Sequence, residues 1–162
     1  MAARRQRELL EIGTPAPAFC LARLEGGDAT LASLPAQART LLVFFKISCP
    51  TCQLAMPYLE RLHLSTGLPV YGISQNDAES TREFIDYFKV TFPILLDPED
   101  DDFPASNAYG LSSVPTMYLV EPDGVISRVV EGWTRIDMEK LGADAGITLF
   151  REGDNVPAWK AG

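Results

Sequence analysis

Two cysteines separated by two residues are the part of this sequence best suited to chemistry. Cys49 and Cys52 follow an apolar run, residues 40–45, that predicts a buried β-strand, and they precede residues 53–64, whose spacing predicts a helix. A thiolate at a helix start is stabilised by the unpaired N–H groups and by the positive end of the helix dipole. Two thiols one helical turn apart can close a disulfide and reopen it. The pattern therefore predicts dithiol–disulfide exchange.

The order of the two cysteines predicts different roles for them. Cys49 is nearer the helix start, so we expect its thiol to be the more exposed and to act as the attacking nucleophile. Cys52 lies one turn further in, and we expect it to resolve the mixed disulfide. Between them, Pro50 fixes one backbone angle and removes one N–H donor, with Thr51 beside it. The alternative is a buried pair without a chemical role.

Three further side chains are candidates: two near the cysteine pair and the third cysteine of the chain. Ser48 directly precedes the first cysteine. Lys46 stands near the end of the predicted strand, where it is either a cation that favours the thiolate or a lysine that extends into solvent from the strand edge. Cys20 alternates with apolar neighbours in another predicted strand, which favours a small buried side chain. A second resolving thiol is the alternative for Cys20.

The sequence does not predict a metal site. The chain holds three cysteines and one histidine, so a zinc site would have to recruit every one of them. An acidic run at residues 97–102 lacks the spacing of a calcium-binding loop and predicts a solvated loop. We therefore predict no metal and no cofactor other than the redox-active disulfide between Cys49 and Cys52.

Composition limits the partners. The 162 residues are 46% apolar and 22% charged, as in an ordinary globular domain, and the net charge of −8 argues against nucleic acid, which needs clustered Lys and Arg. No apolar segment predicts a membrane span or a signal peptide, so we predict a cytoplasmic protein, or an exported one if a signal has been removed. We expect a monomer or a weak dimer.

The hydrophobic pattern predicts an α/β fold. We expect an N-terminal arm at 1–12, one domain at 13–150 and an extended tail at 151–162. Alternating elements predict parallel strands with right-handed crossovers, and the turn at 121–124 predicts an antiparallel hairpin. The result is a central mixed sheet flanked by helices on both faces. We predict strands at 18–24 (an edge strand), 41–47, 68–74, 92–96, 116–120 and 125–130, and helices at 53–64, 78–90 and 136–145. We expect a strand end followed by a single helical turn at 29–34, and a helix or a turn at 104–109.

Several motifs in this order resemble the thioredoxin-fold redoxins, which include the AhpC/TSA peroxiredoxins and the TlpA-type thiol–disulfide oxidoreductases. The resemblance covers residues 13–145 and is carried by the segments 13–19, 44–52, 56–57, 72–74, 92–97, 109–111, 114–116 and 123–124. It implies a thioredoxin-like fold with an N-terminal extension of the redoxin type. It also implies a disulfide-containing protein or small molecule as substrate and an external dithiol reductant.

The resemblance assigns a substrate site to Val114, Pro115 and Thr116. On its residues alone, Pro115 is a trans proline that opens a strand. In the redoxins the matching proline is cis and packs against the active-site disulfide, and the backbone before it binds extended substrate. The resemblance therefore implies a cis bond after Val114 and a groove beside it.

This sequence also departs from the redoxin patterns. Leu42 and Lys46 stand where peroxiredoxins have a proline and a threonine, and a cysteine stands where they often have a glutamate. Val43 and Ala55 replace the buried carboxylates of thioredoxins and of some TlpA-type proteins. We therefore predict a thiol–disulfide oxidoreductase rather than a peroxidase.

Two alternatives to this function stay open. The first is a thiol peroxidase, in which Cys49 becomes a sulfenic acid and Cys52 condenses with it. The second is a non-catalytic module that binds a peptide in the groove beside Pro115.

Overall fold

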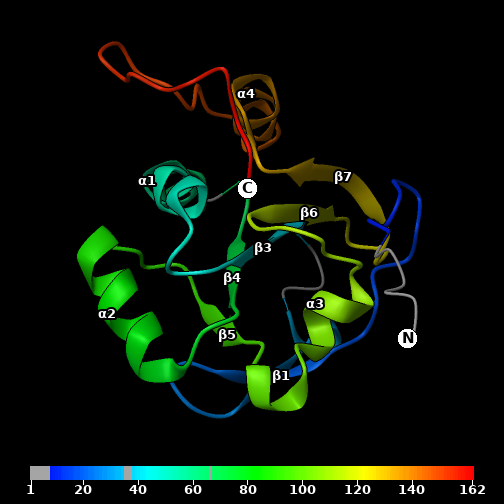
Figure 1. Ribbon diagram of the computed structural model, residues 1–162. Helices are drawn as coiled ribbons and strands as arrows, with labels where there is room; N and C mark the ends of the chain where they lie inside the picture. The colour runs from blue at the N-terminus through cyan, green and yellow to red at the C-terminus, as the bar shows by residue number, and fades with distance from the viewer. Residues whose placement is uncertain (1–7, 35–37, 66) are drawn as a thin grey trace, which may run out of the picture.

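A seven-stranded mixed sheet forms the centre of the computed structural model, which describes residues 8–34, 38–65 and 67–162. The strands lie in the order β2-β1-β5-β4-β3-β6-β7 (Figure 1). Strand β4 pairs in parallel with β3 and β5, and the other neighbours are antiparallel. The strands are β1 (Cys20–Arg23), β2 (Asp28–Thr30), β3 (Thr40–Phe45), β4 (Val70–Ser74), β5 (Ile94–Leu96), β6 (Thr116–Val120) and β7 (Ile126–Glu131).

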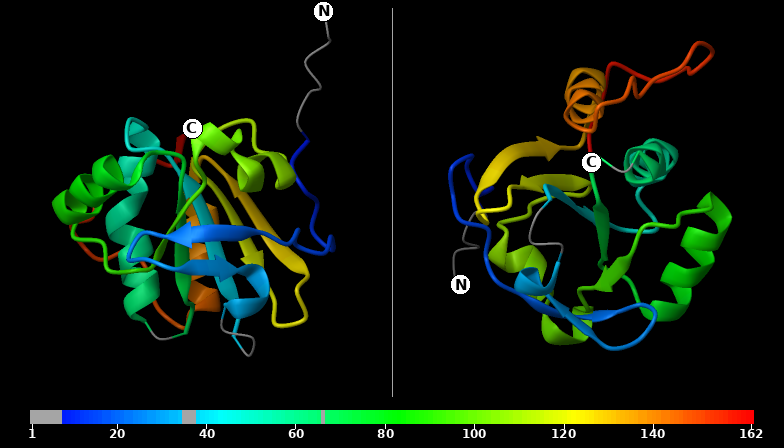
Figure 2. Two further views of the ribbon diagram at one scale, coloured as in Figure 1. Left: turned by 90° about the horizontal axis from the view of Figure 1, so that it is seen from below. Right: turned by 180° about the vertical axis from the view of Figure 1, so that it is seen from behind.

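Helices cover both faces of this sheet (Figures 1 and 2). Three of them share one hydrophobic cluster and therefore one face: α1 (Pro50–Leu64), α2 (Ala78–Phe88) and α4 (Arg135–Asp144). The short helix α3 (Pro104–Ala108) packs on the opposite face, together with the N-terminal segment. Single 3-10 turns occupy Leu31–Ser33 (η1) and Glu99–Asp101 (η2).

Strand β3 explains why the sequence pattern was continuous rather than alternating. All six of its residues are buried, because both faces of the central sheet are covered. Val43 and Phe45 point into the cluster beneath α1 and α2. Leu42 and Phe44 point into the other cluster, where the rings of Phe44 and Tyr109 lie 5.2 Å apart. The strand that leads to Cys49 is thus fixed from both sides.

The predicted fold class is confirmed, and two strand predictions are corrected. The segment at 18–24 is not an edge strand, because β1 lies between β2 and β5. The central strand ends at Phe45 rather than Ile47, so Lys46 is exposed and lies outside the sheet.

Cys20 is exposed, so the expectation that it is a small buried side chain is wrong. Successive residues of a strand face opposite ways, and in β1 it is Leu21 that points into the core. The alternation was recognised, but which of the two faces is covered depends on the packing of the N-terminal hairpin.

The acidic run is a solvated loop only in part. Residues 99–102 are exposed, as predicted, but Asp97 is fully buried. Its carboxylate accepts hydrogen bonds from the backbone N–H groups of Ala105 and Ser106, each at 2.8 Å, and from the Ser106 hydroxyl at 2.5 Å. These bonds satisfy donors at the start of α3, which otherwise has no side-chain cap. Asp97 therefore anchors α3 to the end of β5.

The two ends of the chain add features that the sequence pattern did not predict. Residues 1–7 of the predicted arm lie outside the described residues, and residues 8–12 form no helix. In the tail, β9 (Trp159–Lys160) pairs with β8 (Trp133–Thr134) as a separate two-stranded sheet. The Arg61 guanidinium binds both carboxylate oxygens of Asp154, at 2.6 and 3.2 Å, and so ties the tail to α1.

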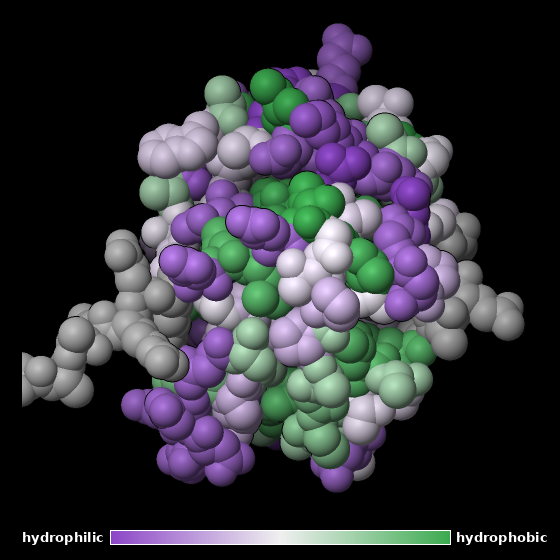
Figure 3. All heavy atoms as spheres, turned by 90° about the vertical axis from the view of Figure 1, so that its right-hand side faces the viewer, coloured by the Kyte–Doolittle hydropathy of each residue, from purple (hydrophilic) through white to green (hydrophobic). Residues whose placement is uncertain are grey.

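Among the described residues, no helix is long and apolar enough to span a bilayer. On the face shown in Figure 3, hydrophobic and hydrophilic residues are interspersed, as is usual for a protein surface.

Candidate active site

Strand register brings four loops to one edge of the sheet. Phe45 of β3 lies opposite Ser74 of parallel β4, so the residues that follow these two strands leave the sheet together. Phe44 also lies opposite Thr116, the first residue of antiparallel β6, and Thr116 in turn lies opposite Glu131, the last residue of β7. The loops at 46–49, 75–77, 112–115 and 132 therefore meet at the same place.

Cys49 is the N-cap residue of α1. Its backbone is extended, with φ −89° and ψ 113°, and its Sγ accepts a hydrogen bond from the Cys52 N–H at 3.1 Å. Its thiol donates to the backbone oxygen of Val114 at 3.4 Å, and the side chain is half-buried. A sulfur in this position faces the unpaired N–H groups and the positive dipole end of the helix. The predicted placement of the first thiol is therefore confirmed, while its role as nucleophile stays a prediction.

Cys52 is enclosed by the apolar core beneath α1. Its side chain has no exposed surface and belongs to the same cluster as Val43 and Ala55. Burial, and then a hydrogen bond with the Cys49 side chain, raise the pKa of the Cys52 thiol well above its ordinary value. Cys52 is therefore a neutral thiol in the reduced protein, suited to act second.

The raised pKa of Cys52 predicts a loss of stability in alkali. The folded chain keeps a proton that the unfolded chain releases near the ordinary thiol pKa of 9.0, so the reduced protein becomes less stable as the pH rises past that value. Between about pH 8.5 and about pH 10, reduced wild type should lose roughly 1 kcal/mol more than a Cys52→Ala variant. Urea unfolding of both proteins at the two pH values measures this, and equal losses would contradict it.

The peptide bond between Val114 and Pro115 is cis, as the redoxin resemblance implied. Val114 is half-buried and presents its backbone oxygen to Cys49, whereas Pro115 is buried. The side chain of Thr116 is also buried, and its hydroxyl donates to the Ser113 oxygen at 2.9 Å. Thr116 thus supports the turn from within, and substrate binding by this loop stays a prediction.

The other predicted neighbours lie around the cysteine pair. Pro50 opens α1, and Ser48 and Lys46 are both exposed. Lys46 lines a hollow that it shares with Gln75 and Val114. Ser48 lines a different hollow, on the side of α2. The structure brings all these residues to one site, and their chemical roles stay predictions.

Asn76 and Gln53 hold the loop before Cys49 and were missed in the sequence. The Ile47 N–H donates to Asn76 Oδ1 at 3.0 Å, and the Ile47 oxygen accepts from Gln53 Nε2 at 3.0 Å. Both backbone groups of Ile47 are thereby satisfied, which keeps the loop in one conformation. A signal existed: polar residues directly after β4 occupy the same sheet edge as the cysteines.

Removing the Asn76 side chain should loosen this loop. We expect Asn76→Ala to lower the rate of Cys49 thiol–disulfide exchange about three- to tenfold, with a loss of only about 1 kcal/mol in the free energy of unfolding. Asn76→Asp keeps an acceptor oxygen for the Ile47 N–H and should restore most of the folded-state stability. Stopped-flow exchange rates beside urea unfolding test this, and a rate unchanged by Asn76→Ala would contradict it.

The tail also reaches the site, which nothing in the sequence pattern indicated. The Thr51 hydroxyl donates to the backbone oxygen of Ala161 at 2.5 Å. Gly162 lies so close to Val114 that a Cβ on it would overlap the Val114 oxygen. Thr51, one of the two residues between the cysteines, and the loop before Pro115 thus both contact residues 161–162.

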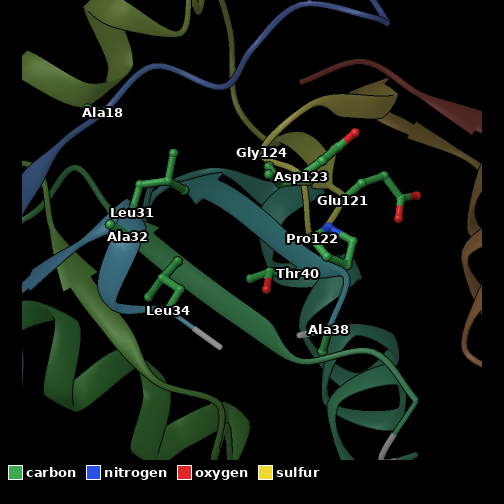
Figure 4. Close-up of a pocket in the computed structure, with 11 residues that line it drawn as sticks. Ala18, Leu31, Ala32, Leu34, Ala38, Thr40, Glu121, Pro122, Asp123 and Gly124 are labelled. Atoms are coloured by element: carbon green, nitrogen blue, oxygen red, sulfur yellow. The ribbon is translucent and has the colours of Figure 1, made fainter. Parts of the chain in front are cut away.

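A well-formed apolar hollow lies away from this chemistry (Figure 4). Leu31 and Leu34 line it, together with the hairpin turn at 121–124 and Thr40, which begins β3. Because Cys49 follows the other end of β3, the hollow and the cysteine pair are separated by the length of the strand.

Comparison with known proteins agrees with this arrangement. The sequence model of the AhpC/TSA family matches residues 12–129. The chain belongs to the AhpC/TSA family. Two similar relatives are thiol-disulfide oxidoreductase ResA of Halalkalibacterium halodurans, 31% identical over 78% of this chain and 72% of ResA, and thioredoxin-like protein YneN of Bacillus subtilis, 32% identical over 81% and 78%.

Solved structures place this AhpC/TSA member in the thioredoxin-like fold. The thioredoxin domain of a thiol-disulfide oxidoreductase from Bacteroides vulgatus is 25% identical and superposes with a TM-score of 0.70, over 76% of this chain and 91% of that domain. A putative protein disulfide isomerase from Bacteroides thetaiotaomicron is 24% identical, with a TM-score of 0.76 over 86% and 91%. The fold predicted from the resemblance is therefore confirmed.

The described residues present no cluster of three or more His, Cys, Asp and Glu side chains placed to hold a metal ion. In the acidic run at 97–102, Asp97 caps α3 and the other acidic side chains lie exposed.

Proposed function

We propose that this AhpC/TSA protein is a thiol–disulfide oxidoreductase that reduces or exchanges disulfides with Cys49 and Cys52. The observation that carries the proposal is the asymmetry of the pair. Cys49 is half-buried at the N-terminus of α1, where a thiolate is stabilised, whereas Cys52 is buried within 3.1 Å of it through its backbone N–H. One thiol is thus placed to meet a substrate, and the other to meet only its partner.

The proposed reaction proceeds in two exchanges. The Cys49 thiolate attacks one sulfur of a substrate disulfide, forms a mixed disulfide with it and expels the other sulfur as a thiolate. Cys52 then gives its proton to solvent or to the expelled thiolate and attacks the Cys49 sulfur. This step forms the Cys49–Cys52 disulfide and releases the second substrate thiolate. The substrate has gained two electrons, and the protein has lost two.

An external dithiol must then reduce the Cys49–Cys52 disulfide by two further exchanges, in which the dithiol loses two electrons and becomes a disulfide. We propose no other cofactor, because the electrons and protons of both exchanges balance without one. The backbone of Val114 lies beside Cys49 and is the natural place for an extended substrate to bind, so disulfide-containing peptides or proteins are the proposed substrate class. Whether the protein reduces or oxidises them depends on its reduction potential relative to its partners.

Peroxide is the competing oxidant. Leu42 is fully buried and Lys46 is exposed at the positions where the peroxidase pattern has a proline and a threonine, so a dedicated peroxide site is not expected. Reduced protein should be mixed separately with hydrogen peroxide and with insulin whose disulfide bonds are intact. Loss of the Cys49 and Cys52 thiols should be followed by mass spectrometry. Rapid disulfide formation with insulin and slow formation with peroxide supports the proposal. The reverse order would make this protein a peroxidase.

A further inference from the structure

The tail crosses the candidate active site as an extended strand. Residues 159–162, termed the strap, begin with β9, whose residues Trp159 and Lys160 pair with Thr134 and Trp133 of β8. Just before the strap, the Ala158 oxygen accepts a hydrogen bond from the Arg135 N–H at 2.9 Å. The antiparallel pairing leads the chain past α4 toward the start of α1, where it meets the site (Figures 1 and 2).

The end of the strap fits closely against the site through backbone atoms. Ala161 offers its oxygen to the Thr51 hydroxyl at 2.5 Å. A Cβ on Gly162 would overlap the Val114 oxygen, and a Cβ on Gly132 would lie only 2.9 Å from the Lys160 oxygen. Glycines at both contact points therefore let backbone approach backbone.

The carbonyl that the strap covers is the one that Cys49 uses. The Val114 oxygen accepts a hydrogen bond from the Cys49 thiol at 3.4 Å, and Gly162 packs against the same oxygen. The strap residues are themselves exposed and are held by a two-residue ladder and one hydroxyl bond. Such a segment resembles an extended peptide in a groove and is held by few enough bonds to be displaced.

We propose that the strap is a built-in occupant of the peptide groove, which an extended disulfide substrate must displace before it reaches Cys49. A small reagent needs only the half-exposed sulfur and reacts with the strap in place. The apparent affinity for peptide substrates is then proportional to the fraction of molecules in which the strap is displaced. The inference rests on the proposed function for its redox consequence, but the access it describes is measurable without redox chemistry.

Truncation after Ala158 isolates the effect of the strap. It removes residues 159–162 and leaves the bonds of Pro157 to Trp133 and of Ala158 to Arg135. In a Cys20→Ser background, alkylation of Cys49 should be timed with iodoacetamide and with a maleimide coupled to a short extended peptide. We expect truncation to speed the peptide reagent about five- to tenfold and iodoacetamide less than about twofold.

Two point variants test the same contact without truncation. Gly162→Ala adds a methyl group where it would overlap the Val114 oxygen, so it should displace the strap and speed the peptide reagent as truncation does. Lys160→Ala is the matched control, because its side chain is exposed and its backbone contacts remain. It should leave both alkylation rates unchanged.

Each outcome decides the inference. Equal acceleration of both reagents, no acceleration, or slower reaction of the peptide reagent after truncation overturns it. Reduction of oxidised insulin by the same proteins separates it from the proposed function. If alkylation depends on the strap but insulin is not reduced, the proposed function is refuted and the role of the strap is supported. If insulin is reduced but alkylation does not depend on the strap, only the role of the strap is refuted.

Discussion

Cys49→Ser is expected to slow disulfide reduction at least about a thousandfold, because a serine hydroxyl does not ionise near neutral pH and is a poor nucleophile toward sulfur. The substitution is nearly isosteric at an N-cap where serine is favoured, so the protein should fold normally. Initial rates of insulin reduction, with dithiothreitol as the resetting dithiol and corrected for its own reaction, measure the effect.

Two further cysteine variants make this expectation specific. Cys52→Ser should still attack substrate but not resolve, so a mixed disulfide between Cys49 and a substrate peptide should accumulate and be visible as a mass adduct. Cys20→Ser alters an exposed thiol on β1 and should leave the rate unchanged. Loss of activity in Cys20→Ser, with activity retained in Cys49→Ser, would refute the assignment of the nucleophile.

Asp97→Ala is expected to lower the free energy of unfolding by about 3 kcal/mol, because it leaves buried donors at the start of α3 without a partner. Those donors are the N–H groups of Ala105 and Ser106 and the Ser106 hydroxyl. Urea unfolding with the slope held common to both proteins measures the change.

The controls distinguish a cap from a general effect of negative charge. Asp97→Asn keeps one acceptor oxygen and should recover part of the loss. Asp100→Ala removes an exposed carboxylate from the same acidic run and should change stability by less than about 0.5 kcal/mol. If Asp100→Ala is as damaging as Asp97→Ala, the hydrogen bonds at the start of α3 are not the source of the effect.

The parts of the fold and site that could be predicted are those with local signals. The buried run of β3, the CxxC at a strand-to-helix junction and the turn at 121–124 each follow from a few adjacent residues. The cis bond at Pro115 did not follow from its own residues, which favour trans, and came only from the resemblance. The placement of Cys49 and Cys52 was predictable because the helix N-terminus that positions them lies next to them in the chain.

The parts that were missed depend on contacts between distant segments. In the sequence, Asp97 is one of several neighbouring acidic residues, and its role as a cap depends on the packing of α3 against it. Asn76 is a polar residue after a strand, and its contact with Ile47 depends on the pairing of β4 with β3. The alternation in β1 left open which face of the strand is buried, and the packing of the N-terminal hairpin determines that Cys20 lies on the exposed face. The tail at 159–162 has no periodic pattern, because a two-residue strand is too short to show one.

The hydrogen bond from Thr51 to the Ala161 oxygen places one residue under two constraints at once. A residue between paired cysteines is usually discussed as a setting for the redox chemistry of the pair. Here its hydroxyl also fastens a segment 110 residues away. An engineer who varies position 51 to shift the reduction potential would therefore change the attachment of the tail in the same step. Serine is the substitution that preserves the hydroxyl, and selection on either property would restrict the choice for the other.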